Sequence, residues 1–97
     1  MQPVIPHSRP AIDENEVNAV VKVLRSGQLS HGPVTRDFES RLSEMVARDV
    51  ACVSSGTAAL HLALIRTGVK AEHRVAIPTH CCPSVLYALH YIGAQPE

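Results

Sequence analysis

The sequence predicts an α/β fold built on a mostly parallel sheet. Two observations support this: short apolar runs alternate with longer segments of helical periodicity, and glycine or small-residue turns separate them. With 97 residues, the chain is limited to at most one domain, since domains typically contain about 100 to 150 residues. Its composition, 45% hydrophobic and 19% charged, is that of a chain able to pack a core.

The N-terminal half is predicted to contain an extended arm and two amphipathic helices. Residues 1–12 include three prolines, which fix local dihedrals and remove backbone donors, so we expect an extended arm. Asp13 suits a helix N-cap, acidic residues follow it in the first turn, and an apolar stripe continues to a stop at Gly27. Apolar residues at helical spacing over residues 34–46 predict a second helix.

The C-terminal half is predicted to alternate strand, helix, strand and helix. Residues 50–53 form an apolar run too short for a helix and are predicted to be a buried strand, followed by a helix over residues 57–65. Residues 74–78 predict a second strand stopped by proline, and residues 85–92 predict a helix that ends at Gly93. This order is typical of a parallel sheet with right-handed crossovers.

The sequence ends at residues 95–97, where the alternation predicts that a third strand should follow. Parallel sheets are normally buried on both faces, and a pair of strands leaves polar backbone groups unpaired along both edges. We therefore expect the chain to be the opening of a larger fold. In isolation it should be poorly stable, aggregate or depend on a partner.

Charge and cysteine usage argue against several functional classes. The nine basic and nine acidic residues balance, which argues against binding to nucleic acid. No apolar stretch approaches the roughly 20 residues of a membrane span, and the N-terminus lacks the pattern of a secretory signal. Three cysteines make a poor disulfide framework, so we expect a reducing, cytoplasmic setting.

The segment from Val53 to Leu60 is predicted to turn from a strand through small residues directly into a helix. Such a junction directs free backbone N–H groups and the positive end of the helix dipole to one place, which suits a phosphate. Gly56 permits close approach, and the hydroxyls of Ser55 and Thr57 add donors. The segment lacks the Gly-Lys-Ser/Thr and multi-glycine signatures of nucleotide loops, so an ordinary helix cap remains the alternative.

Several further motifs occur in one order along the chain. They are Arg9-Pro10, the segment from Asp13 to Leu29, His31-Gly32-Pro33, Phe38-Glu39, and residues 54–64, 75–78 and 92–96. Together they closely resemble the N-terminal part of the DegT/DnrJ/EryC1/StrS aminotransferases, pyridoxal-phosphate (PLP) enzymes that aminate nucleotide-linked keto-sugars. The resemblance covers the chain from about Ile5 onward.

The resemblance implies the start of a fold-type-I PLP-dependent transferase large domain, with a three-layer αβα arrangement of which residues 13–97 form an incomplete N-terminal portion. It further implies a homodimer that transfers an amino group from glutamate or glutamine to a nucleotide-linked keto-sugar, in polysaccharide or lipopolysaccharide biosynthesis. The loop over residues 27–33 matches a family loop close to the active site.

The resemblance also implies which residues bind the cofactor. Ser55, Gly56, Thr57 and Ala58 match the segment that holds the cofactor phosphate, mainly through backbone N–H groups. Cys82 stands where the family usually places an aromatic residue that stacks on the cofactor ring, and a thiol offers less stacking area.

Transamination needs a lysine that holds PLP as a Schiff base and a carboxylate that keeps the pyridine nitrogen protonated. The only lysines, Lys22 and Lys70, do not match the family's Schiff-base position. We therefore assign no catalytic residue and expect this polypeptide alone not to transaminate. A fragment of a related PLP-dependent sugar dehydratase and a non-catalytic interaction or phosphate-binding module remain alternatives.

The histidines and cysteines do not predict a metal site. His80 precedes the adjacent pair Cys81 and Cys82, but zinc sites usually separate their cysteines by two to four residues, and adjacent side chains of an extended chain point apart. His61, on an apolar helix, is interpreted as a packing residue.

Overall fold

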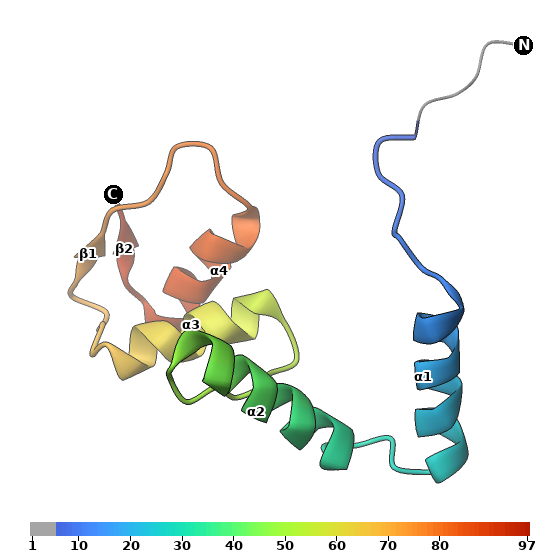
Figure 1. Cartoon of the computed structure of the whole chain (residues 1–97). Coiled ribbons are helices and arrows are strands. Elements are labelled where there is room, and N and C mark those ends of the chain that lie inside the picture. The colour runs from blue at the N-terminus through green and yellow to red at the C-terminus, as the bar shows by residue number, and fades with distance from the viewer. Residues whose placement is uncertain (1–5) are drawn as a thin grey trace, which may run out of the picture. The chain divides into compact units, whose positions relative to one another are not determined.

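The computed structural model describes residues 6–97, which form two compact units (Figure 1). The first ends at Val50 and the second is Ala51–Glu97. Of the predicted N-terminal arm, residues 1–5 lie outside the described part, and residues 6–12 are exposed and form neither helix nor strand.

The first unit contains two helices, α1 (Glu14–Ser26) and α2 (Pro33–Val46), which confirms both helix predictions. Local polar contacts fix the start of α1: the Asp13 carboxylate accepts from the Asn15 N–H at 2.7 Å, and the Glu16 carboxylate accepts from the Asp13 N–H at 2.7 Å. This reciprocal arrangement is a capping box. Gly27 ends α1 in the left-handed region, with φ 70°.

Helix α2 begins and ends differently from α1. Gly32 is its N-cap without a side-chain hydrogen bond, and Pro33 occupies the first turn, where the missing N–H has no intrahelical acceptor anyway. Ala47 ends the helix with φ 50°, and it is the non-glycine residue with positive φ within residues 6–97. The termini of α2 are therefore set by backbone conformation.

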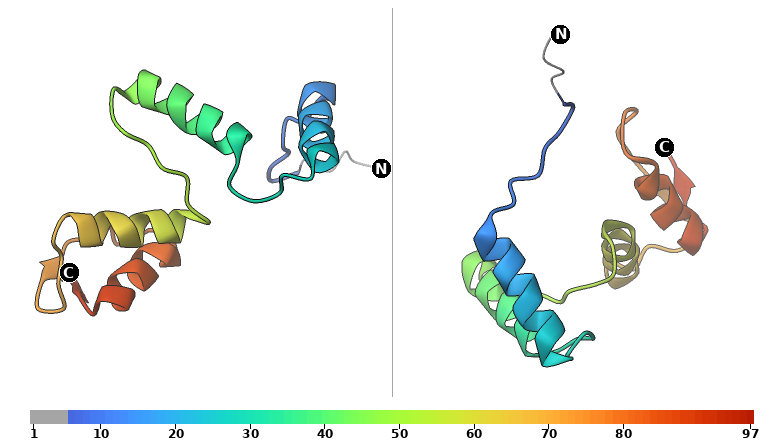
Figure 2. Two further views of the ribbon diagram at one scale, coloured as in Figure 1. Left: turned by 90° about the horizontal axis from the view of Figure 1, so that it is seen from below. Right: turned by 90° about the vertical axis from the view of Figure 1, so that its right-hand side faces the viewer.

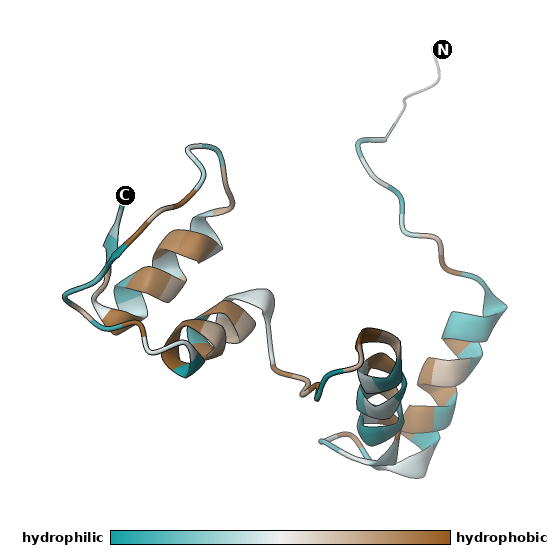
Figure 3. Cartoon of the chain, turned by 60° about the vertical axis from the view of Figure 1, so that its left-hand side comes forward, coloured by the Kyte–Doolittle hydropathy of each residue, from teal (hydrophilic) through white to brown (hydrophobic). Residues whose placement is uncertain are grey.

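The second unit contains α3 (Gly56–Arg66), β1 (Arg74–Val75), α4 (Pro83–Ile92) and β2 (Gln95–Pro96). The strands pair in parallel, with Arg74 opposite Gln95, and α4 forms the crossover between them. Helices α3 and α4 lie side by side with their N-terminal ends at the same end of the pair (Figures 1 and 2). They are also the more apolar helices of the chain (Figure 3). The α/β class is confirmed.

The core of this unit is small. Among residues 6–97, the fully buried residues are Ala88, Leu89 and Ala94. Ala88 and Leu89 lie on α4, and Ala94 lies in the short connection between α4 and β2. His61 of α3 contacts the Tyr91 ring of α4 edge to face, with centroids 5.5 Å apart, which confirms its interpretation as a packing residue.

Two strand predictions need correction. Residues 50–53, predicted to be a strand, form no ladder, because the sheet within residues 6–97 contains only β1 and β2 and neither lies alongside them. The strand expected next after the helix that ends at Gly93 is present as Gln95–Pro96. The strand predicted over residues 74–78 is confirmed only at Arg74–Val75.

Candidate functional site

The candidate phosphate site is the N-terminus of α3, and its geometry follows from Ser55. This residue is the N-cap, with extended backbone, and its Oγ accepts from the Ala58 N–H at 3.1 Å. Its carbonyl accepts from the Ala59 N–H at 3.0 Å. The small side chains that follow start the helix without crowding the turn.

Two N–H groups at this terminus have no acceptor within the described chain. Those of Gly56 and Thr57 occupy the first helical positions, where no preceding carbonyl is available to them. A Cβ added at Gly56 would meet nothing within 4 Å, so the space beside the backbone there is open. Since α3 is 11 residues long, its dipole adds a partial positive charge at the same place.

The residues present therefore fit a phosphate group. The N–H groups of Gly56 and Thr57 are available as donors, and the hydroxyls of Ser55 and Thr57 lie on the same turn. The N–H of Ala58 is already bonded to Ser55, so this predicted phosphate contact is occupied within the protein. Within the predicted segment, the backbone N–H groups of Gly56 and Thr57 are therefore the donors that remain available to a phosphate.

Cys82 lies at the N-cap of α4 and is exposed. Because α3 and α4 begin at the same end of the helix pair, the structure brings Cys82 and Ser55 to that end (Figure 2). Hydrogen bonds from the Ser84 hydroxyl and then the Ser84 backbone N–H lower the pKa of the Cys82 thiol, because they stabilise its charged form. The thiol is therefore more acidic than an ordinary cysteine.

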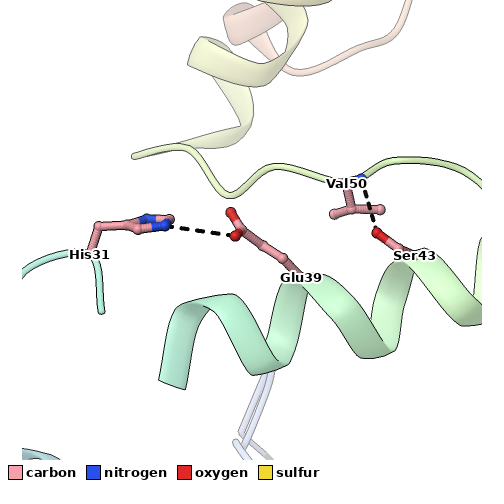
Figure 4. Close-up of polar contacts among 4 residues, drawn as sticks. All are labelled: His31, Glu39, Ser43 and Val50. Carbon is pink, nitrogen blue, oxygen red and sulfur yellow. Dashed lines mark hydrogen bonds and ion pairs between the residues drawn. The ribbon is translucent and has the colours of Figure 1, made fainter. Parts of the chain in front are cut away.

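The loop between α1 and α2 is held by a contact that sequence reasoning did not predict. His31 Nε2 lies 3.7 Å from Glu39 Oε2, and the Glu39 side chain is only 17% exposed (Figure 4). One turn further along α2, the Ser43 hydroxyl accepts from the Val50 N–H at 3.1 Å (Figure 4). Polar side chains of α2 thus fix the segments on either side of it.

A shallow hollow of about 370 Å³ opens beside this loop. His31 and Arg36 give it a basic edge. Sequence reasoning did not single out Arg36. The sequence offered one signal for Arg36, because this residue follows the Gly32-Pro33 helix start by one turn and so lies near the loop.

Other site classes receive no support from the described residues. Residues 6–97 contain no group of three His, Cys, Asp or Glu side chains arranged to hold a metal ion. No helix in the same part of the chain has the length and apolar character needed to cross a bilayer. Cys52, Cys81 and Cys82 form no disulfide bonds.

The fold and the site together define an α/β protein in which a capped helix N-terminus, next to a parallel βαβ unit, is suited to bind an anionic group. Residues 10–97 match the model of the DegT/DnrJ/EryC1/StrS aminotransferase family. The chain belongs to this family, which confirms the resemblance predicted from the sequence motifs.

Solved structures give the same result. The chain is similar to Spr1654 from Streptococcus pneumoniae, a protein assigned as a sugar aminotransferase, in its PMP form, its PLP form and its apo form. Each comparison gives a TM-score of 0.87 at 36% identity and covers 96% of this chain. The chain spans 24% of the length of Spr1654, so it corresponds to a fragment of that fold.

Proposed function

We propose that this chain supplies the cofactor-phosphate segment of a PLP-dependent aminotransferase that acts on nucleotide-linked keto-sugars, with glutamate or glutamine as amino donor. The observation that carries the proposal is the start of α3, where Gly56 and Thr57 offer free N–H groups beside open space. Membership of the aminotransferase family and the likeness to PLP and PMP forms of Spr1654 support PLP as the group that binds there.

When bound, PLP supplies an electron-accepting ring for amino-group transfer. The residues of this chain bind and orient it. Gly56 and Thr57 donate backbone hydrogen bonds to the phosphate, and the dipole of α3 favours its negative charge. The Ser55 hydroxyl accepts from Ala58 and keeps its own proton free to donate.

Binding, without amino transfer, is the role we propose for residues 6–97. Lys22 lies on exposed α1 and Lys70 in the turn before β1, and both side chains belong to exposed residues. Neither belongs to the candidate phosphate site at the start of α3. Incubation of the purified chain with PLP, glutamate and a nucleotide-linked keto-sugar should therefore give no aminated sugar, and turnover would contradict the proposal.

We further propose a homodimeric working unit in the cytoplasm. Apolar side chains on α1 and α2 stay uncovered within the described residues, including Val20 at 59% and Phe38 at 53% exposure, and such faces suit subunit contacts. The three cysteines, none of them in a disulfide, suit a reducing compartment. Sedimentation of the full enzyme at several concentrations tests the dimer.

The direct test titrates the chain with inorganic phosphate and with PLP while amide chemical shifts are recorded. We expect selective shifts at Gly56 and Thr57. Gly56→Val should weaken phosphate binding by at least about tenfold, because its side chain fills the open space beside these donors.

The matched control is Ala59→Val, which places the same valine side chain on the same helix. The Ala59 N–H is already bonded to the Ser55 carbonyl, so this variant should bind phosphate as the unaltered chain does. Equal binding by the unaltered chain and by Gly56→Val would overturn the proposal. Shifts confined to other residues would do the same.

A further inference from the structure

Two adjacent cysteines, Cys81 and Cys82, lie directly before α4, in the connection that leads from β1 (Figure 1). Neither is in a disulfide, and they differ in burial, since Cys81 is half-buried and Cys82 is exposed. The backbone of Cys82 is extended, with φ −62° and ψ 136°, and adjacent side chains of extended backbone point to opposite sides. The structure therefore describes a reduced pair in which one thiol is accessible and its neighbour is partly covered.

The position of Cys82 favours the nucleophilic form of its thiol. Cys82 is the N-cap of a 10-residue helix, and the N-terminus of a helix carries a partial positive charge. Pro83 lacks an N–H, so the first backbone donor of this helix belongs to Ser84. Interaction with the Ser84 hydroxyl, and then with its backbone N–H, lowers the pKa of the thiol. The thiolate that results is the form that reacts with oxidants.

The backbone before Cys82 has few restraints. Residues 78–81 form neither helix nor strand, and their backbone makes no hydrogen bond to the rest of residues 6–97. Bonds fix the chain only on either side of this segment, where the Ile77 N–H donates to the Glu97 carbonyl at 2.9 Å and the Val85 N–H donates to the Cys82 carbonyl at 3.1 Å. The peptide unit before Cys82 can therefore rotate while the sheet stays paired.

We propose that Cys81 and Cys82 form a redox-sensitive pair, in which a hydroperoxide oxidises Cys82 and Cys81 then closes a disulfide between the adjacent residues. The Cys82 sulfur attacks one oxygen of the hydroperoxide, the O–O bond breaks, Cys82 becomes a sulfenic acid, and water or an alcohol leaves. The Cys81 sulfur then attacks the Cys82 sulfur, the S–O bond breaks, and the oxygen leaves as water with the Cys81 proton. Both thiols are oxidised, and the hydroperoxide is reduced by the same pair of electrons.

The geometry of adjacent residues makes this disulfide reversible. Consecutive Cα atoms lie about 3.8 Å apart, below the roughly 4.4–6.8 Å that is usual for a disulfide, so the ring is strained and easily reduced. Closing the ring also takes Cys82 out of its N-cap geometry and weakens the bond from Val85 to its carbonyl. Because α3 and α4 begin at the same end of the helix pair, oxidation changes the structure at the end where Ser55 lies (Figure 2).

The test treats the full 97-residue chain with hydrogen peroxide and maps the cysteine peptides by mass spectrometry. We expect each thiol of the Cys81–Cys82 peptide to lose its hydrogen, and a dithiol reductant to restore both. Cys81→Ser should stop at a sulfenic acid on Cys82, which dimedone traps. Cys82→Ser should slow oxidation of the peptide at least about tenfold, whereas the control Cys52→Ser should form the disulfide at the unaltered rate.

Two further measurements tie the reaction to the structure of α4. Ser84→Ala should slow disulfide formation about two- to threefold in buffer but not in concentrated urea, where the helix is unfolded. In the oxidised chain, the Val85 amide should exchange faster, whereas the Gln95 amide should keep its protection, because it bonds to the His73 carbonyl at 3.0 Å in the sheet.

Three results would overturn the proposal. They are a disulfide that joins Cys52 or a second chain in place of the adjacent pair, oxidation of Cys82 in the unaltered chain directly to the sulfinic acid, and equal rates for Ser84→Ala and the unaltered chain in buffer. None of these measurements involves PLP, so failure of the proposed cofactor role would leave the test unaffected.

Discussion

The Cys82 thiol shows how one neighbouring side chain alters the chemistry of a residue. Cys82 is the N-cap residue of α4. Interaction with Ser84, first with its hydroxyl and then with its backbone N–H, favours the thiolate and lowers the pKa of the Cys82 thiol. At a given pH below that pKa, a larger fraction of Cys82 is ionised than of an ordinary cysteine, and the thiolate is the reactive form.

We predict that Ser84→Ala slows alkylation of Cys82 by iodoacetamide near neutral pH. Removing the first of the two hydrogen bonds raises the thiol pKa, so the pH at which the alkylation rate is half-maximal should move upward. Peptide mass spectrometry measures the rate at each cysteine, and Cys52 is the internal control. Identical pH profiles at Cys82 in the two proteins would refute the role of Ser84.

At the level of the helix, Asp13 makes the start of α1 sensitive to pH. Its carboxylate accepts from the Asn15 N–H, and this bond, followed by the interaction with Glu16, lowers the pKa of Asp13. A carboxyl whose pKa is lower in the folded state stabilises that state above its unfolded pKa. That contribution is lost as the pH falls through the folded pKa.

We therefore predict that the first turn of α1 frays on acidification below about pH 4, the ordinary range of an aspartate. Amide exchange at Asn15 and the residues after it, measured between pH 5 and pH 2, reports the fraying. Asp13→Asn keeps a good N-cap that does not titrate, so the first turn of this variant should lose most of the pH dependence. A profile identical to that of the unaltered chain would show that Asp13 does not control this turn.

Gly93 connects α4 to β2 in a conformation that disfavours side chains. Its φ is 81°, and a Cβ there would lie 3.2 Å from the Ala71 Cβ. We predict that Gly93→Ala destabilises the second unit by about 1–2 kcal/mol from the left-handed backbone, with a further cost from the contact. Urea unfolding followed at residues of α4 measures the change.

Gly27→Ala is the control for Gly93→Ala, since Gly27 has φ 70° but no atom within 4 Å of an added Cβ. Gly27→Ala should destabilise the first unit only by the cost of placing an alanine in the left-handed backbone region. An equal loss for both variants would show that the Ala71 contact is relieved without cost.

The helices could be predicted from the sequence because local residues determine them. Asp13 and Ser55 cap α1 and α3, and Gly93 ends α4, all through contacts within a few residues. Residues 50–53 could not be assigned in the same way, because a strand exists only where another strand pairs with it. Residues 50–53 have the apolar pattern of a strand, but no strand within residues 6–97 pairs with them.

The candidate site was predictable to the same extent. Small residues at positions 55–58 predicted a turn suited to a phosphate, and the structure retains free donors at Gly56 and Thr57. The use of the Ala58 N–H by Ser55 depends on the side-chain rotamer of the cap. The hydrogen bonds of Ser84 to Cys82 likewise depend on how α4 begins, which composition does not specify.

Across the whole molecule, burial is concentrated in the second unit. The fully buried residues among positions 6–97 all lie between Ala88 and Ala94, and α1 and α2 contain none. Burial of apolar surface contributes roughly 25 cal/mol per Å², and it must offset about 1–2 kcal/mol of backbone entropy per ordered residue. Large apolar side chains such as Met45, at 81% exposure, contribute little to that balance.

We therefore predict that the isolated 97-residue chain unfolds without a sharp cooperative transition. Calorimetry should show a broad, weak heat-absorption profile, and a dye that binds exposed apolar surface should fluoresce before heating. Amide exchange should be slowest near Leu89 and Ala94, where the Ala94 N–H bonds to the Leu89 carbonyl at 3.1 Å, and fastest in α1. A sharp cooperative melt of the chain alone, with uniform protection from α1 to α4, would mean that the exposed faces contribute more stability than their burial indicates.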